Sequence, residues 1–383
     1  MRRFAPWILL PLLPLLAAGG EGDFLADHFA NPIAGAPGPH WGPLESTLKP
    51  ADCGACHPAQ LHDWGGSRHS LAMSPGLQMQ LIDNPLANDM CNTCHAPLSE
   101  QRPVVASAEA FRSDLQASGL SCPACHVRDG VVHGPPAREQ AQAAPSAAPH
   151  GGFEPHDAFE DSAFCGTCHQ FGEGGFRIEG VLLENTLQEW KASPQGQRGE
   201  YCQSCHMPDR RHLWRGIHDP EMTEGGLDIE LIEVSRRKFR YSVTNSGIGH
   251  SFPTYVTPRV SLILEGLSSD GEALVREGTI IQRRIDVYLQ EQQYDTRLAP
   301  LETATVEISW RSRLPVVRVV GRLLVEPDEF YFRFFQVYRA ASPESQALHA
   351  LALEEAGTSP YVIGERTWPS PSRSDSGIAI PQE

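Results

Sequence analysis

The sequence has few basic residues relative to acidic ones, few methionines, and no hydrophobic segment of the length that a membrane span needs. Its 383 residues include 31 Lys and Arg against 47 Asp and Glu, so the formal net charge is −16 at pH 7. This balance excludes a broad attraction to nucleic-acid phosphates or to anionic lipid headgroups. Hydrophobic residues make up 40% of the chain and charged residues 20%. This composition excludes a membrane-embedded bundle and a disordered protein, and the length suffices for two or three domains.

The N-terminus has the order of a secretory signal peptide. Arg2 and Arg3 precede an apolar run over residues 4–16, and the small residues 17–20 follow. The run is too short to cross a bilayer, so we predict that residues 1–20 are a signal peptide and that the protein is periplasmic or extracellular. The first cysteine is Cys53, so we expect no lipid attachment near the cleavage point and no stable membrane anchor. Loss of the two arginines changes the net charge from −16 to −18, which favours partners with a basic docking face.

All ten cysteines belong to one repeated pattern, CxxCH. The five copies, numbered here as motifs 1 to 5, are Cys53-Gly-Ala-Cys56-His57, Cys91-Asn-Thr-Cys94-His95, Cys122-Pro-Ala-Cys125-His126, Cys165-Gly-Thr-Cys168-His169 and Cys202-Gln-Ser-Cys205-His206. CxxCH is the attachment signature of c-type haem: two thiols bind the porphyrin vinyl groups and the adjacent histidine binds the iron. Zinc sites or disulfides would leave the histidine after every second cysteine unexplained. We therefore predict five covalently attached haem c groups, with His57, His95, His126, His169 and His206 as proximal ligands.

The motifs are too closely spaced for each to have a protein core of its own. They lie between residues 53 and 206, about 30 residues per haem, far less than an independent domain requires. The porphyrins must then supply much of the buried apolar surface and pack close together. We expect a mainly helical and loop domain over residues 21–224 with little regular structure, including helices at 107–116 and 183–192.

Histidine is the better candidate for the second axial ligand of most irons. Sixteen histidines are present and five belong to the motifs, whereas there are six methionines including the initiator. Bis-histidine ligation implies low reduction potentials. From their positions near the motifs or in glycine-rich turns, the distal candidates are His69, His133, His156, His218 and His250. His62, His150 and His212 compete with His69, His156 and His218 respectively, and His28, His40 and His349 are interpreted as surface residues.

After residue 224 the pattern changes to alternating, β-branched segments. They lie at 227–234, 238–244, 259–267, 280–289, 303–310, 316–325 and 330–338. Short strands separated by turn residues predict an antiparallel β-sandwich over 225–357, so the fold class is α+β. A helix over 342–356, with Ser342 as N-cap, closes it, and residues 358–383 form a loosely held tail. The segment contains no catalytic grouping, and we expect the turn that carries His250 to cap one haem.

The chain resembles the multihaem c-type cytochromes related to the tetrahaem electron acceptor of the hydroxylamine-oxidation pathway, with an added β-rich C-terminal domain. The resemblance rests on the five CxxCH sites and on four further segments. These are Trp64-Gly-Gly-Ser67-Arg-His69, Phe164-Cys165-Gly-Thr-Cys168-His169-Gln170-Phe171, Cys202-Gln-Ser-Cys205-His206-Met207-Pro208 with Gly216-Ile-His218-Asp219, and Gly249-His250-Ser-Phe-Pro253-Thr254. The resemblance implies electron transfer outside the cytoplasm through closely stacked haems, with other redox proteins as donor and acceptor.

Three functions stay open at this point. The first is an electron carrier in which every iron has six ligands, and no catalytic residue is assigned for it. The second is an oxidoreductase that acts on a small nitrogen or sulfur compound at one five-coordinate haem; the absence of a CxxCK site and of a sixth to eighth haem departs from the related enzymes. The third is a subunit of a filament or electron-transfer complex, in which a neighbouring molecule supplies a missing distal histidine.

Overall fold

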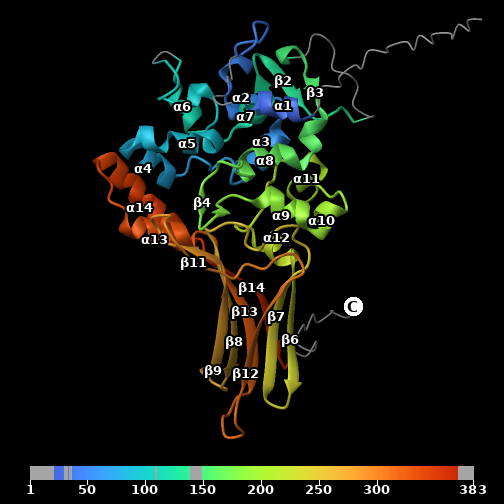
Figure 1. The fold of residues 1–383 in the computed structure, drawn as a ribbon. Coiled ribbons are helices and arrows are strands. Elements are labelled where there is room, and N and C mark those ends of the chain that lie inside the picture. Colours follow the sequence, from blue (N-terminus) through green and yellow to red (C-terminus); the bar gives the residue numbers. More distant parts are fainter. Residues whose placement is uncertain (1–20, 30–32, 34–36, 108–109, 139–148, 370–383) are drawn as a thin grey trace, which may run out of the picture.

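The computed structural model describes residues 21–29, 33, 37–107, 110–138 and 149–369. The predicted signal peptide and the end of the predicted tail lie outside these residues. The described part has a helical half that carries the motifs and an elongated β-sandwich at the other end (Figure 1). No helix within the described ranges has the length and apolar character needed to span a membrane.

The helical half consists of short helices joined by turns, as the spacing of the motifs predicts. Its helices are α1 (Glu21–His28), α2 (Pro50–Gly54), α3 (Pro58–Gly65), α4 (Pro75–Asp83), α5 (Pro85–His95), α6 (Ser113–Gln116), α7 (Cys122–His126), α8 (Ser162–His169), α9 (Thr186–Ala192), α10 (Pro194–Gln197), α11 (Cys202–His206) and α12 (Pro220–Gly225). Its short strands are β1 (Val127–Arg128), β2 (Val131–Gly134), β3 (Glu154–Pro155), β4 (Arg177–Ile178) and β5 (Val181–Leu182). Proline at the first turn starts many of these helices, because its fixed φ suits that position.

The C-terminal half confirms the predicted antiparallel sandwich. One sheet has the order β12-β7-β6 and the other β14-β13-β8-β9, and β10 pairs with β11 beside them. The strands are β6 (Leu227–Ser235), β7 (Lys238–Asn245), β8 (Arg259–Leu267), β9 (Ala273–Ile281), β10 (Arg283–Ile285), β11 (Gln292–Asp295), β12 (Thr303–Ser309), β13 (Arg318–Glu326) and β14 (Tyr361–Trp368). Alternate residues of β7, among them Phe239, Tyr241 and Val243, fill the core between the two sheets.

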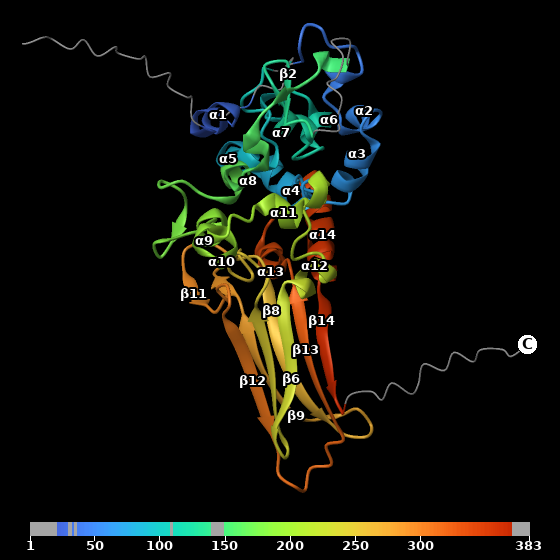
Figure 2. The same ribbon diagram turned by 90° about the vertical axis from the view of Figure 1, so that its right-hand side faces the viewer.

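Two predictions for this half were wrong. Residues 330–338 form not a strand but helix α13 (Glu329–Val337), in which the rings of Phe330 and Phe334, of Tyr331 and Phe335, and of Phe334 and Tyr338 are in contact one turn apart. Aromatic residues favour strands only where a sheet face is available, and here the partner is a helix. Residues 361–368 of the predicted loose tail form β14, which lies beside β13 (Figure 2). In addition, the strand expected at 280–289 divides into β9 and β10.

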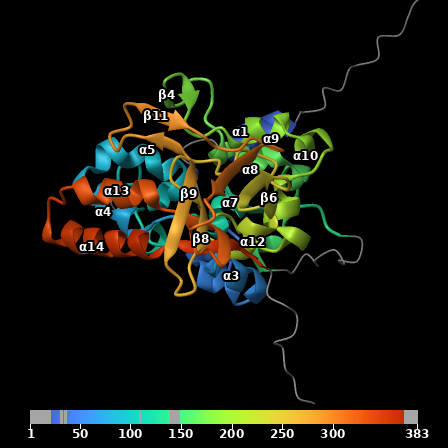
Figure 3. The same cartoon turned by 90° about the horizontal axis from the view of Figure 1, so that it is seen from below.

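Helices α13 and α14 (Pro343–Thr358) join the sandwich to the helical half. Ser342 caps α14 as predicted, since its side chain accepts a hydrogen bond from the Ser345 amide. Both helices lie to one side of the strands, next to α4 and α5, when the molecule is viewed from below (Figure 3). Met79 of α4 is fully buried with Phe335 and Ala352. A Cβ at Gly76 would lie 2.3 Å from the Phe335 ring, so glycine allows this close approach.

Replacing Phe335 by Ala should lower the free energy of unfolding by about 3–5 kcal/mol, the usual cost of emptying a buried aromatic site. Phe335 is 6% exposed and contacts both α4 and α14. The measurement is urea unfolding followed by far-UV circular dichroism. The matched control is Leu351→Ala on the outer face of α14, which is 50% exposed and should change stability by about 0.5 kcal/mol or less. Equal stability of the two variants would contradict this packing.

Candidate haem sites

Each attachment motif lies on or directly after a helical turn, which places its two cysteines on one side of the chain. Motif 1 begins in the last turn of α2, motifs 2 and 4 form the ends of α5 and α8, and motifs 3 and 5 make up α7 and α11. Residues three apart in a helix are neighbours, so the thiols of each motif can reach one porphyrin edge. None of the ten cysteines forms a disulfide. This local geometry suits thioether attachment at every motif.

Hydrogen bonds fix which ring nitrogen of the motif histidines is protonated. The Nδ1–H groups of His95, His126 and His206 donate to the carbonyl oxygens of Ala72 (2.7 Å), His133 (2.8 Å) and Arg215 (2.6 Å). A carbonyl oxygen can only accept, so Nδ1 carries the proton and Nε2 is left with its lone pair for a metal. Burial lowers the pKa of His126 to about 4, which keeps this imidazole neutral, as metal binding requires.

His169 of motif 4 differs from the others. Its Nδ1 is hydrogen-bonded to the hydroxyl group of Tyr255, which lies in the segment between β7 and β8. Burial lowers the pKa of His169 to about 4 and raises that of Tyr255 well above its usual value. The β-rich half therefore supplies a neutral phenol that orients a proximal histidine, in the role that backbone carbonyls have at motifs 2, 3 and 5.

Three motif histidines face a second histidine. The ring centroids of His169 and His69 are 6.2 Å apart, those of His126 and His212 6.1 Å, and those of His206 and His250 6.4 Å. A metal–imidazole bond is about 2 Å long and the ring centre lies about 1 Å behind the nitrogen, so two axial imidazoles on one iron have centres about 6 Å apart. All three separations fit an iron between the rings.

His212 and His250 also have the ring tautomer that a ligand needs. Their Nδ1–H groups donate to the carbonyl oxygens of Arg210 (3.1 Å) and Ser251 (2.9 Å), so Nε2 is free in both. His250 lies in the turn after β7, and this turn does reach back to motif 5. His212 was considered only as a competitor of His218. Both follow motif 5 closely, so chain position alone could not choose between them.

The other distal candidates are not brought to a motif histidine ring. The backbone carbonyl of His133 accepts the hydrogen bond from Nδ1 of His126. The imidazole ring of His133 contacts His28 and Phe24. His156 accepts a hydrogen bond at Nδ1 from the Ala158 amide, and its ring stacks on Phe24. The Nε2 atom of His218 is 3.0 Å from Asp328. All sixteen histidines lie in the described ranges, and among them neither His57 nor His95 has a ring contact with another histidine.

Two further histidines have contacts of note: His28, which was interpreted as a surface residue, and His150, which was a competitor of His156. His28 is 3% exposed and its Nε2 donates to the Cys125 carbonyl (2.8 Å), so its assignment to the surface was wrong. His150 donates from Nδ1 to the Gly152 carbonyl (2.6 Å) and contacts Trp41. Trp41 packs against the cluster of Leu48, Leu115 and Val127, and the Nε2 atom of His150 is left free.

Contacts between thiols show which motifs are neighbours in space. Hydrogen bonds join Cys53 to Cys122, Cys94 to Cys168 and Cys165 to Cys202. Motif 1 is therefore next to motif 3, motif 2 next to motif 4, and motif 4 next to motif 5. The order in space is not the order in the sequence, and motif 4 occupies the central position.

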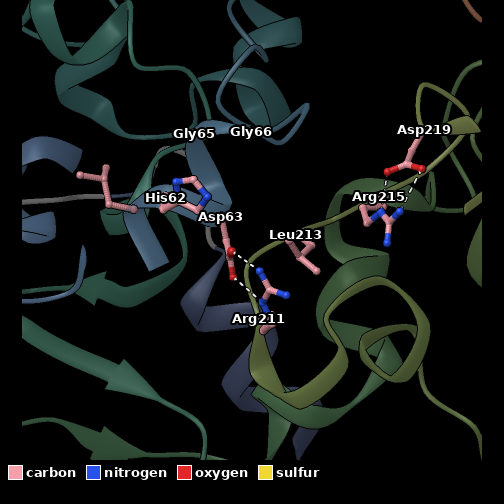
Figure 4. Close-up of a pocket in the computed structure, with 9 residues that line it drawn as sticks. His62, Asp63, Gly65, Gly66, Arg211, Leu213, Arg215 and Asp219 are labelled. Carbon is pink, nitrogen blue, oxygen red and sulfur yellow. Dashed lines mark hydrogen bonds and ion pairs between the residues drawn. The ribbon is translucent and has the colours of Figure 1, made fainter. Parts of the chain in front are cut away.

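His212 belongs to a segment that is clamped to α3 beside an open cleft. The guanidinium of Arg211 donates twice to the Asp63 carboxylate, at 2.7 and 3.2 Å (Figure 4). The cleft has a volume of about 610 Å³ and is also lined by His62, Leu213 and Arg215. Asp63 is 8% exposed, and hydrogen bonding to Arg211 holds its pKa below the usual range. This pair fixes the backbone on which His212 projects.

A buried acid and two tyrosines lie near motifs 2 and 4. The Oε2 atom of Glu184 is buried and has no hydrogen-bond partner among the described residues. Burial, assisted by the charge of Glu189, raises the pKa of Glu184 to about 8, and its charge acts on Cys94, Tyr255 and Tyr331. Burial also raises the pKa of Tyr331 to about 12, although 38% of this side chain is accessible.

The comparisons with known proteins agree with this geometry. Residues 52–127, which hold motifs 1 to 3, match the family model described as cytochrome c554 and c-prime. A search of curated protein sequences gives no match. The structure is similar to that of a penta-haem cytochrome c552 from Thermochromatium tepidum, with a TM-score of 0.58 and 17% identity over 76% of this chain and 94% of that one. At this identity the likeness concerns the fold. The family match over residues 52–127 and the shared fold both agree with the multihaem c-type cytochrome that the attachment motifs predict.

Proposed function

We propose that this protein is an exported electron carrier with five haem c groups, held in a continuous array by one chain. The observation that carries the proposal is the set of three histidine pairs with ring separations of 6.1–6.4 Å. When bound, the haems supply reversible one-electron chemistry. The protein's own residues place the imidazoles, keep them neutral and exclude water from the sites. Donor and acceptor are other redox proteins, and the acidic charge of the chain favours basic docking faces on them.

In this proposal the distal ligands are His212 for motif 3, His69 for motif 4 and His250 for motif 5. Burial lowers the pKa of His69 to about 3, so its imidazole stays neutral. For motif 1 we propose His150, whose Nε2 is free. If the chain supplies none, a histidine from a neighbouring molecule would complete the motif 1 site, as in a filament or complex.

Low-temperature EPR of the oxidised protein, with and without cyanide or nitrite, tests the proposal. We expect low-spin signals from motifs 3, 4 and 5 that do not respond to the added ligand, because both axial positions are taken. His69→Met, His212→Met and His250→Met variants assign the signals. High-spin, ligand-binding iron at any of these three motifs would contradict the assigned pairs.

A second candidate function, reduction or oxidation of a small nitrogen or sulfur compound, is favoured by one observation at motif 2. His95 has no facing histidine, while Tyr331 and Glu184 provide proton-donating groups beside Cys91 and Cys94. The same EPR experiment decides between the functions. A high-spin motif 2 signal that changes with nitrite supports this one, and a low-spin motif 2 signal that does not respond to nitrite excludes it.

A further inference from the structure

The sites of motifs 3 and 4 are neighbours, and their connection matters for the whole array. Cys125 of motif 3 lies within electrostatic range of Cys165 and Cys168 of motif 4. An electron that moves between motifs 1 and 3 and the other three sites passes between these two. The contacts between their facing histidines therefore bear on this transfer.

The side chain of Trp214 lies between His69 and His212. Its ring centroid is 4.7 Å from that of His69, which faces motif 4, and 5.1 Å from that of His212, which faces motif 3. The ring meets His212 edge-on, at 90°. Both separations lie within the range of direct aromatic contact. The rings of His69 and His212 make no contact of their own among the described residues, so the indole is the aromatic link between them.

The backbone holds Trp214 in place at a conformational cost. Its φ is +39°, a value that a bulky residue rarely adopts. Such conformations persist where the surroundings fix them, and they concentrate at functional positions. Here the flanking residues are pinned on both sides, Arg211 to Asp63 and Arg215 to Asp219 and Glu221.

The segment that carries Trp214 touches the ligands of three motifs. Arg215 accepts the hydrogen bond from His206 of motif 5, His212 faces His126 of motif 3, and Trp214 contacts His69 opposite His169 of motif 4. One short stretch of chain therefore sets the spacing between three haem sites.

We propose that Trp214 is a positioning residue that couples the motif 3 and motif 4 haems electronically, through π contact with the distal ligands His212 and His69. This proposal rests on the ligand pairs of the proposed function. The step it serves is a one-electron exchange: one iron is oxidised as the other is reduced, no bond forms or breaks, no proton moves, and no further reactant is needed.

The test compares two substitutions in the complete, haem-loaded protein. Trp214→Leu removes the π system and keeps an apolar side chain, whereas Trp214→Phe keeps an aromatic ring. Rapid-freeze EPR after pulse reduction follows electron redistribution between the motif 3 and motif 4 signals. The Leu variant should slow this redistribution several-fold and the Phe variant much less, while EPR signals at equilibrium and reduction potentials stay unchanged in both. Trp310→Leu, in the sandwich against Phe239, is the matched control and should behave as the parent.

Three results would overturn the proposal. One is a Leu variant that redistributes electrons at the parent rate. Another is equal slowing in the Leu and Phe variants. The third is loss of the low-spin signals in both, which would make Trp214 a support of the ligands and not a link between them. The ligand pairs are checked separately by the His69→Met and His212→Met spectra. Failure there rejects the proposed ligands, whereas an unchanged rate with correct ligands rejects only the role of Trp214.

Discussion

Replacing His250 by Met should raise the reduction potential of the motif 5 haem by on the order of 100 mV, part of the roughly 0.8 V range that axial ligands cover. A thioether favours ferrous iron more than an imidazole does. His250 is the histidine whose ring lies 6.4 Å from that of His206 and whose Nδ1–H is fixed by the Ser251 carbonyl. Redox titration followed optically and by EPR measures the shift, and one of the low-spin signals should change its g-values.

His156→Met is the matched control for this experiment. His156 is also near a motif in the sequence, but its Nδ1 accepts a hydrogen bond from the Ala158 amide and it contacts no motif histidine. We therefore expect the spectra and potentials of this variant to match the parent. An unchanged motif 5 potential in His250→Met would remove His250 from the ligand set, and a changed spectrum in His156→Met would return His156 to the candidate ligands.

Replacing Glu184 by Gln should remove a pH dependence from the potentials of the haems at motifs 2 and 4. Because the pKa of Glu184 is raised to about 8 by burial, its carboxyl group loses its proton in the alkaline range. The resulting negative charge stabilises ferric iron, so the parent potential should fall as the pH rises through about 8. One proton per electron limits the slope to about 59 mV per pH unit. The groups around Glu184 are Glu189, Arg283, Tyr255 and Tyr331.

The same substitution has a predicted effect on stability. The pKa of Glu184 is higher in the folded protein than the usual 4.5, so the folded state retains a proton that the unfolded chain releases. This contribution is fully present below pH 4.5 and is lost as the pH rises through about 8. Glu184→Gln should therefore gain stability relative to the parent over that range. The control is Glu200→Gln, an exposed carboxylate paired with Arg198, and an unchanged slope in Glu184→Gln would rule out this coupling.

The attachment sites could be predicted from the sequence because their chemistry is local. Two thiols and a histidine within five residues bind one porphyrin whatever the rest of the chain does. The sandwich was also predictable, since alternation along each strand reports which face is buried. The aromatic segment at 329–337 was not, because its choice between helix and strand depends on α4 and α14, which lie far away in the sequence.

The distal ligands could be predicted only in part. His69 and His250 were identified from a Trp-flanked segment and a glycine-rich turn, but a ligand is defined by the iron it faces, and that partner is 100 residues away for the His69–His169 pair and 44 for His206–His250. The choice of His212 over His218 depends on two distant aspartates. Asp63 holds Arg211, the neighbour of His212, whereas Asp328 occupies the Nε2 atom of His218.

The number, position and covalent chemistry of the haem sites are predictions of the sequence by itself, because those features require only adjacent residues. The tertiary structure alone decided which histidine faces which motif, which motifs are neighbours, and what lies between them. Distances in space are set by packing between segments distant in the chain, such as the Arg211–Asp63 clamp and the turn that brings Tyr255 to His169. The position of Trp214 between His69 and His212 follows from that packing.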